Sequence, residues 1–114
     1  MILFYQLLLG HFVADFALQS DSMARGKNRN RKPENIPPGQ IPMAVWPYWL
    51  SAHAGIHATA VYVVTHVWWL SLTELVLHAS IDFMKCENKL TIHQDQALHY
   101  TCKALYALIV WRWL

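Results

Sequence analysis

Four long apolar segments of the chain are interrupted by polar residues at a regular spacing. In each segment two of these polar residues stand four positions apart, which is about one helical turn, so each pair lies on one helix face. The sequence therefore predicts helices over residues 2–20, 45–69, 71–87 and 92–113, with a basic, Pro-rich loop at 21–43. We expect a single domain that spans residues 1–114.

Local signals mark where these helices begin. Pro47 suits the first turn of the second helix, where a missing N–H is tolerated. Ser71 and Glu74 form the S-x-x-E pattern of a capping box, which predicts that the third helix begins near Ser71. Thr91 and Gln94 form a second capping-box pattern just before the fourth helix.

The paired polar residues are of the types that bind metal ions. They are His11 with Asp15, His53 with His57, His78 with Asp82, and Asp95 with His99. In an antiparallel arrangement all eight side chains fall at a similar depth, where side chains from facing helices can build one site. We therefore predict an all-α, integral membrane, antiparallel four-helix bundle with a dinuclear metal site.

The amino-acid composition is the reason for predicting a membrane protein. Hydrophobic residues make up 55% of the 114 residues and charged residues 14%, against roughly 25% charged residues in a typical soluble domain. Basic residues gather in the 21–43 loop and the 85–93 connection. The positive-inside rule then predicts that both basic loops are cytoplasmic and that both termini lie on the outer side of the membrane; the family resemblance given below implies that this is a bacterial inner membrane with periplasmic termini. We expect the lipid bilayer as a partner, with a homo-oligomer or a larger membrane assembly left open, and no nucleic acid.

Charge and ligand number favour two metal ions. Three Asp carboxylates in an apolar interior need counter-charge, and two divalent ions with one bridging hydroxide make a neutral cluster. Eight ligands exceed the four of one tetrahedral ion and suit two ions about 3.5–4 Å apart. His-rich ligation without thiolate favours Zn over Fe or Mn. The alternative is a metal-free proton-relay network of His and Asp.

Other polar residues extend the predicted site. Gln19, Lys85 and Gln96 are expected at its mouth, where they would support the metal ligands or bind substrate. Lys85 would either hold an anion such as phosphate or simply extend its amine to water. Glu74 can approach the metals, although its capping role is the simpler prediction. His66 and His93 have no partner at this spacing and are expected outside the site.

The motifs also resemble a known family. They are H-F-V-A-D-F-A-L-Q from His11 to Gln19, Lys27, H-A-G-I-H, H-A-S-I-D-F-M-K and D-Q-A-L-H. Together they resemble a family of small multi-span proteins of unknown function from bacteria and their phages, similar in motifs to candidate inner-membrane metal-dependent hydrolases. The resemblance implies that the eight paired residues form the family's polar signature and that Gln19, Lys27, Lys85 and Gln96 flank it.

Two functions remain open from the sequence. One is a metal-dependent hydrolase that acts on a phosphoester or lipid ester at the cytoplasmic leaflet, through a metal-bound hydroxide. The other is a non-enzymatic, metal-stabilised membrane protein in phage–host interference or in a larger assembly. A metal transporter is disfavoured because the outer halves of the helices are apolar and offer no path. No catalytic residue is assigned.

Overall fold

The computed structural model describes residues 1–32, 36–40 and 43–114. In these residues every regular element is helical, so the prediction of an all-α chain is confirmed. The elements are α1 (Ile2–Phe12), a π-helical segment η1 (Val13–Ala17), α2 (Asp21–Gly26), α3 (Trp46–Thr65), α4 (Trp68–Cys86) and α5 (Ile92–Trp113).

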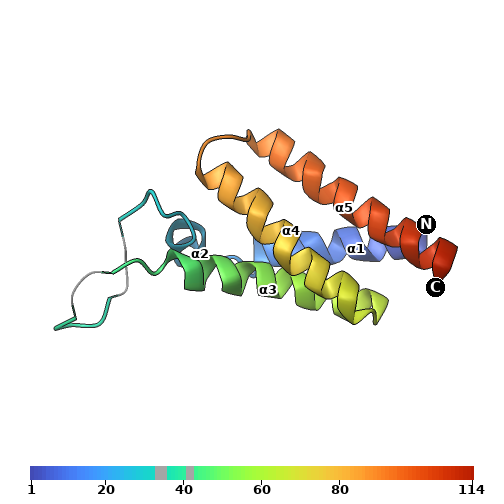
Figure 1. Cartoon of the computed structure of the whole chain (residues 1–114), viewed down its shortest axis with the longest axis horizontal. Helices are drawn as coiled ribbons and strands as arrows, with labels where there is room; N and C mark the ends of the chain where they lie inside the picture. Colours follow the sequence, from blue (N-terminus) through green and yellow to red (C-terminus); the bar gives the residue numbers. More distant parts are fainter. Residues whose placement is uncertain (33–35, 41–42) are drawn as a thin grey trace.

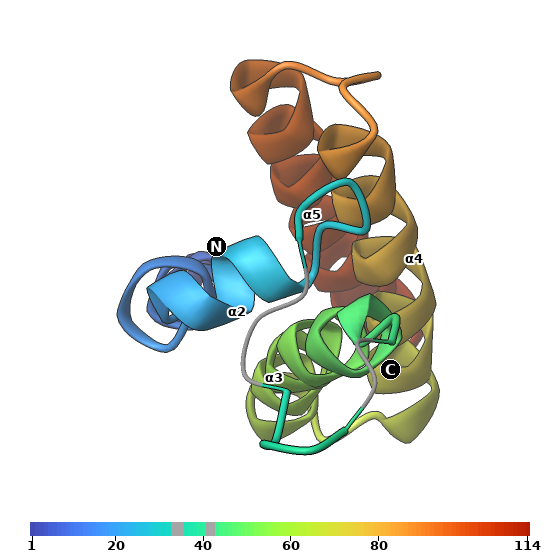
Figure 2. The ribbon, with the colours of Figure 1, turned by 90° about the vertical axis from the view of Figure 1, so that its left-hand side faces the viewer.

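Four of these elements surround a common interior. α1 and its extension η1, α3, α4 and α5 alternate in direction, and both chain ends lie at the end of the molecule opposite α2 (Figure 1). Viewed from that α2 end, α1 lies between α3 and α5, and α4 completes the ring (Figure 2). Residues at matching depths on the four elements can therefore meet.

The helix starts agree with two of the three local signals. Pro47 lies in the first turn of α3, and Thr91 and Gln94 form the expected capping box of α5. The prediction of a helix start at Ser71 is wrong, because α4 already begins at Trp68. The Ser71 hydroxyl instead donates to the carbonyl of Ala58 at 2.7 Å, so it ties α4 to α3.

The first predicted helix, over 2–20, is not continuous. α1 ends at Phe12 and the next turn widens into the π-helical segment η1, which carries Asp15. Single π turns inside helices are found mostly at functional sites. Despite the wider turn, His11 Nε2 and Asp15 Oδ2 remain 3.3 Å apart.

The predictions of an integral membrane protein, of transmembrane helices and of an inner-membrane location with periplasmic termini are wrong. No helix in the described part of the chain is both long enough and apolar enough to cross a bilayer. α1 has only 11 residues, and the 20 residues of α3 include several polar ones. α4 and α5 are long enough but carry several ionisable residues each.

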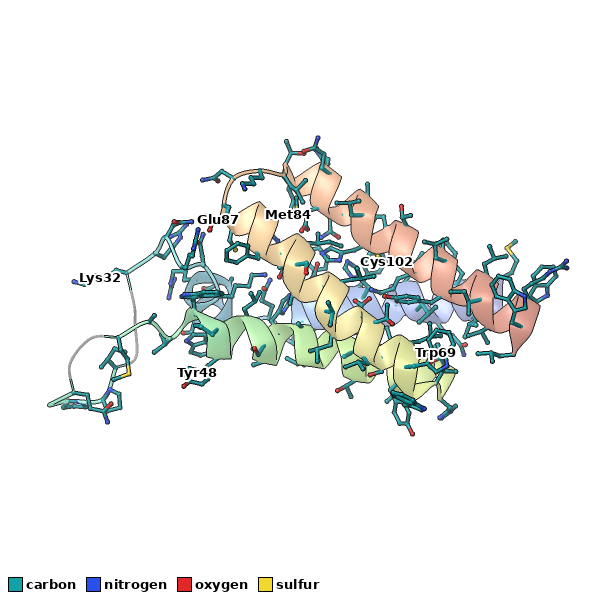
Figure 3. The ribbon with its side chains drawn as sticks, viewed as in Figure 1. Lys32, Tyr48, Trp69, Met84, Glu87 and Cys102 are labelled. Carbon is teal, nitrogen blue, oxygen red and sulfur yellow. The ribbon has the colours of Figure 1, made fainter. Side chains whose placement is uncertain are left out.

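The predicted loop at 21–43 contains the helix α2, and the residues that directly follow α2 are held against the end of α4. Asn30 Nδ2 donates to the Cys86 carbonyl at 3.1 Å and to Glu87 Oε2 at 2.8 Å, and Arg29 forms an ion pair with Glu87. Figure 3 shows Glu87 at the end of α4, facing the segment after α2. Two prolines of this Pro-rich loop, Pro33 and Pro42, lie outside the described residues.

A small apolar core closes the bundle near the chain ends. Leu7, Val61, Leu70 and Tyr106 form it, one from each of the four long elements, and each is at most 3% exposed. The ionisable residues occupy the interior beyond this core, toward α2. Apolar packing therefore stabilises one end of the bundle and polar contacts organise the other.

We expect Leu70→Ala to lower the free energy of unfolding by about 2–5 kcal/mol, because it leaves a cavity in this core. Leu72→Ala, on the same helix but 53% exposed, should change the free energy by less than about 0.5 kcal/mol. Urea unfolding followed by circular dichroism measures both. Equal effects at the two leucines would show that this cluster is not the apolar core.

Candidate metal centre

The structure brings all eight paired residues together in the interior. Seven of them are at most 1% exposed: His11, His53, His57, His78, Asp82, Asp95 and His99. The side chain of the eighth, Asp15, is 9% exposed. The structure does not test whether they bind metal, which stays a prediction, but it does show that the shared spacing reflects one shared site.

One group of four ligand atoms forms around Asp15. Asp15 Oδ1 lies 2.9 Å from His57 Nε2 and 3.3 Å from His53 Nε2. His78 completes a set in which all four ligand atoms lie within 4.8 Å of one another. This group takes residues from η1, α3 and α4.

A second group of three forms beside it. His99 Nε2 lies 3.3 Å from Asp95 Oδ1 and 3.6 Å from Asp82 Oδ1. The two groups are adjacent, because Asp82 Oδ2 is also 3.3 Å from His53 Nε2. A third, overlapping set consists of Glu74, His78 and His99.

His11 and Gln96 support these groups. His11 Nε2 hydrogen-bonds Gln96 Oε1 at 3.1 Å, and the Gln96 amide donates to Asp15 Oδ2 at 3.0 Å and to Asp95 Oδ2 at 3.1 Å. Gln96 therefore joins the carboxylates of both groups. Gln19 has a more distant role, since its amide donates to the Asp15 carbonyl at 3.2 Å.

The imidazoles pack face to face. The His57 and His78 rings are 3.6 Å apart at 24°, and the His78 and His99 rings are 4.2 Å apart at 23°. Burial outweighs the nearby carboxylates and lowers the pKa of His57 to about 3 and of His78 to about 4. Both rings are thus neutral near pH 7, which is the form that binds metal ions.

The carboxylates remain ionised although they are buried. Burial alone would raise the pKa of Asp15, but contacts with His53, His57 and Gln96 hold that pKa well below its usual range. For Asp82 burial is likewise opposed, by His99 and by the charge of Lys27, and the pKa is again lowered. The same carboxylates act on His99, where contacts with Asp82 and Asp95 overcome burial and raise the pKa.

Three lysines supply positive charge to the buried carboxylates. In the sequence analysis, metal ions were the only source of this charge. Lys27 Nζ lies 2.6 Å from Asp82 Oδ2, and Lys103 Nζ lies 2.5 Å from Glu74 Oε1. Lys85 Nζ lies 3.6 Å from Asp82 and 3.5 Å from Asp95. The premise that only bound cations can neutralise these carboxylates is therefore wrong.

Glu74 belongs to the site rather than to a helix cap. It is 1% exposed, and its Oε1 accepts a hydrogen bond from His78 Nδ1 at 3.2 Å. Burial opposes ionisation of Glu74, but His78 and Lys103 lower its pKa to about 2. A carboxylate on the far nitrogen of a histidine fixes the ring so that its other nitrogen faces a metal.

Several atoms inside the centre make no hydrogen bond within the described residues. Those closest to the carboxylates are His53 Nε2, His78 Nε2, His99 Nε2 and Asp95 Oδ1, and His11 Nδ1, His53 Nδ1 and His57 Nδ1 also have no partner in the part of the chain that the structure describes. Such buried polar atoms are uncommon and cost free energy unless water or an ion satisfies them. The three Nε2 atoms lie 3.3–3.7 Å from neighbouring carboxylate oxygens.

Sequence reasoning missed two of the buried lysines as members of the site. Lys103 is four residues after His99, on the face that carries Asp95 and His99, so the same spacing could have found it. Lys27 appeared only through the family resemblance. Nothing in the local sequence places it, because the fold of the segment after α2 carries its side chain to Asp82.

We expect Lys103→Ala to lower the free energy of unfolding by about 3–5 kcal/mol, since it leaves the Glu74 carboxylate buried without its charged partner. The control is Lys89→Ala, which removes the same charge from an exposed position. The double variant Lys103→Met with Glu74→Leu should recover part of the loss. Urea unfolding measures these effects. If Lys103→Ala left the free energy of unfolding unchanged, the ion pair between Lys103 and Glu74 would be contradicted.

Comparison with known proteins gives a family and no function. Neither the curated proteins nor the solved structures contain a match to this chain. A family described as a protein of unknown function, DUF3307, matches residues 3–113. The expected membership of a family of unknown function is thereby confirmed, while the expected likeness to hydrolases stays a prediction. The match covers nearly the whole chain, and the chain belongs to the DUF3307 family.

Proposed function

We propose that the centre binds two divalent metal ions and acts as a metal-dependent hydrolase. The observation that supports this proposal is the set of buried imidazole and carboxylate atoms that face one another without hydrogen bonds. Ligands at about 2.0–2.1 Å from a tetrahedral ion lie roughly 3.3–3.4 Å from one another. The separations of 3.3 Å between His53 and Asp15 and between His99 and Asp95 match that value.

The ligand types favour Zn over Fe or Mn. The two groups offer nitrogen and carboxylate oxygen donors without a thiolate, since Cys86 and Cys102 belong to neither group. Di-iron centres in helical bundles use mostly Glu with E-x-x-H motifs, whereas these groups combine His with the shorter Asp. Both kinds of donor are ordinary Zn ligands.

The unequal size of the two groups favours catalysis. Asp15, His53, His57 and His78 can complete a tetrahedral shell, which is typical of a structural ion. The second group has only three residues, and three protein ligands with one open position are typical of a catalytic Zn, which lowers the pKa of its bound water to about 7. Lys85, 24% exposed and in contact with both Asp82 and Asp95, lies where this group approaches the surface.

The complete first group also favours a second candidate function. An ion held by four protein ligands stabilises a fold and needs no substrate. The chain would then be a non-enzymatic, metal-stabilised protein that contributes to phage–host interference or to a larger assembly. The two candidates differ in whether the three-residue group turns over a substrate.

We expect about two metal ions per chain in protein purified without chelators, measured by inductively coupled plasma mass spectrometry. His57→Ala removes a ligand from the first group and should lower both the metal content and the melting temperature. His93→Ala, which changes an exposed histidine outside the site, should alter neither. A metal-free protein, or equal effects of the two substitutions, would exclude the metal centre.

Hydrolysis is tested with Asp95→Asn, which keeps the side-chain shape but removes a charged ligand from the second group. We expect metal-dependent cleavage of nitrophenyl phosphate or nitrophenyl acetate by the wild type, and a loss of at least tenfold in kcat/KM for the variant. Metal content should fall from about two ions to one. Two bound ions without turnover of any ester would favour the non-enzymatic function.

A further inference from the structure

A cavity with a strongly basic lining lies next to the three-residue group. Its volume is about 280 Å³. Four of its eight lining residues are basic and none is acidic: Arg25, Lys27, Arg31 and Lys85, with Gln19, Ala24, Asn28 and Cys86. A lining with one sign of charge attracts ligands of the opposite sign.

The fold holds this lining in place. Gly26 packs so closely on the Trp49 ring that a Cβ atom at this position would overlap it. Lys27 follows directly and is 3% exposed, and the Asn30 bonds to the end of α4 fix the chain beyond it. Lys27 is thus part of an ordered wall, Lys85 is half-buried, and Arg25 and Arg31 line the cavity from exposed positions.

The cavity and the metal centre share a boundary. Lys27 and Lys85 line the cavity and both contact the Asp82 carboxylate, at 2.6 Å and 3.6 Å. An ammonium group has three N–H donors, so each lysine can contact Asp82 and a ligand in the cavity at the same time. A ligand held there lies beside the group with the open position.

The charge balance identifies the kind of ligand. Asp15, Asp82, Asp95 and Glu74 contribute four negative charges, and Lys27, Lys85 and Lys103 contribute three positive ones. Two divalent ions with one hydroxide would leave a net charge of about +2. Arg31 of the lining adds further positive charge. A phosphate monoester carries close to −2 near pH 7 and has three acceptor oxygens, so it would offset much of this positive charge, whereas a neutral carboxylic ester would offset none of it.

We infer that this basic cavity binds the phosphate group of a phosphomonoester and presents it to the metal centre. Hydrolysis of the bound ester rests on the proposed function, whereas binding of the phosphate group does not. The volume is slightly below the roughly 300–1,000 Å³ of pockets that enclose a drug-sized ligand. It therefore suits the phosphate group, with the rest of the substrate outside.

The test uses isothermal titration of the full chain, loaded with Zn, at constant ionic strength. The probe is phenyl phosphonate, which carries the dianionic head group but has no ester bond to cleave. Arg31→Ala should weaken its binding about tenfold, the effect of one charge-assisted hydrogen bond, and should leave the metal content unchanged. The control is Arg112→Ala, which removes the same charge from the last turn of α5, away from the cavity. This substitution should leave the affinity unchanged.

The outcomes separate this inference from the proposed function. Binding of phenyl phosphonate that depends on Arg31 supports the basic cavity even if no metal is found. Two bound metal ions without phosphonate binding, or equal weakening by Arg31→Ala and Arg112→Ala, would overturn it. A short-chain phosphatidic acid as a second probe shows whether a lipid headgroup or a small organic phosphate binds better.

Discussion

The Asp82 carboxylate is the group on which the arrangement of this chain depends. Buried at 1% exposure, it needs partners, and they come from α3, α5, its own helix α4 and the segment after α2. The partners are His53, His99, His78, Lys85 and Lys27. A desolvated carboxylate without such partners would be neutral or would destabilise the fold, so the contacts with His53, His99 and Lys27 also hold α3, α5 and the residue after α2 against α4.

The site could be predicted from the sequence because one rule governs all four helices. Two polar residues one turn apart must share a face, and four such faces in an apolar chain have only the interior in common. The buried Glu74 and Lys103 obey the same rule on the same faces as His78 and His99. Glu74 was recognised as able to approach the metals but was assigned to a helix cap as the simpler interpretation, and Lys103 was not considered.

The rest depends on tertiary structure and could not be predicted. Composition suggested membrane spans because it counts apolar residues without regard to the ionisable ones between them, such as Glu74, Asp82 and Lys85 in α4. The contact of Lys27 with Asp82 joins residues 55 positions apart, and no local pattern encodes it. The π-helical turn at Asp15 likewise has no local pattern in the sequence that predicts it.

The lysines change the net charge of the centre. With the three Asp carboxylates alone, two divalent ions and one hydroxide would make a neutral cluster, whereas Glu74 and the three lysines together add two positive charges. With Lys27 and Lys85 at its edge, the same ions make a centre of positive charge with an open side. The chain thus places side chains of metal-binding types beside donors for an anion, a combination that suits the proposed hydrolysis of a phosphate ester.

Anomalous X-ray scattering from crystals grown with Zn tests the central claim most directly. We predict two peaks inside the bundle, about 3.5–4 Å apart. One should lie among Asp15, His53, His57 and His78, and the other among Asp82, Asp95 and His99. An interior without a peak, with the lysines paired as described and every imidazole bonded to protein or water, would contradict the account and favour a metal-free polar network.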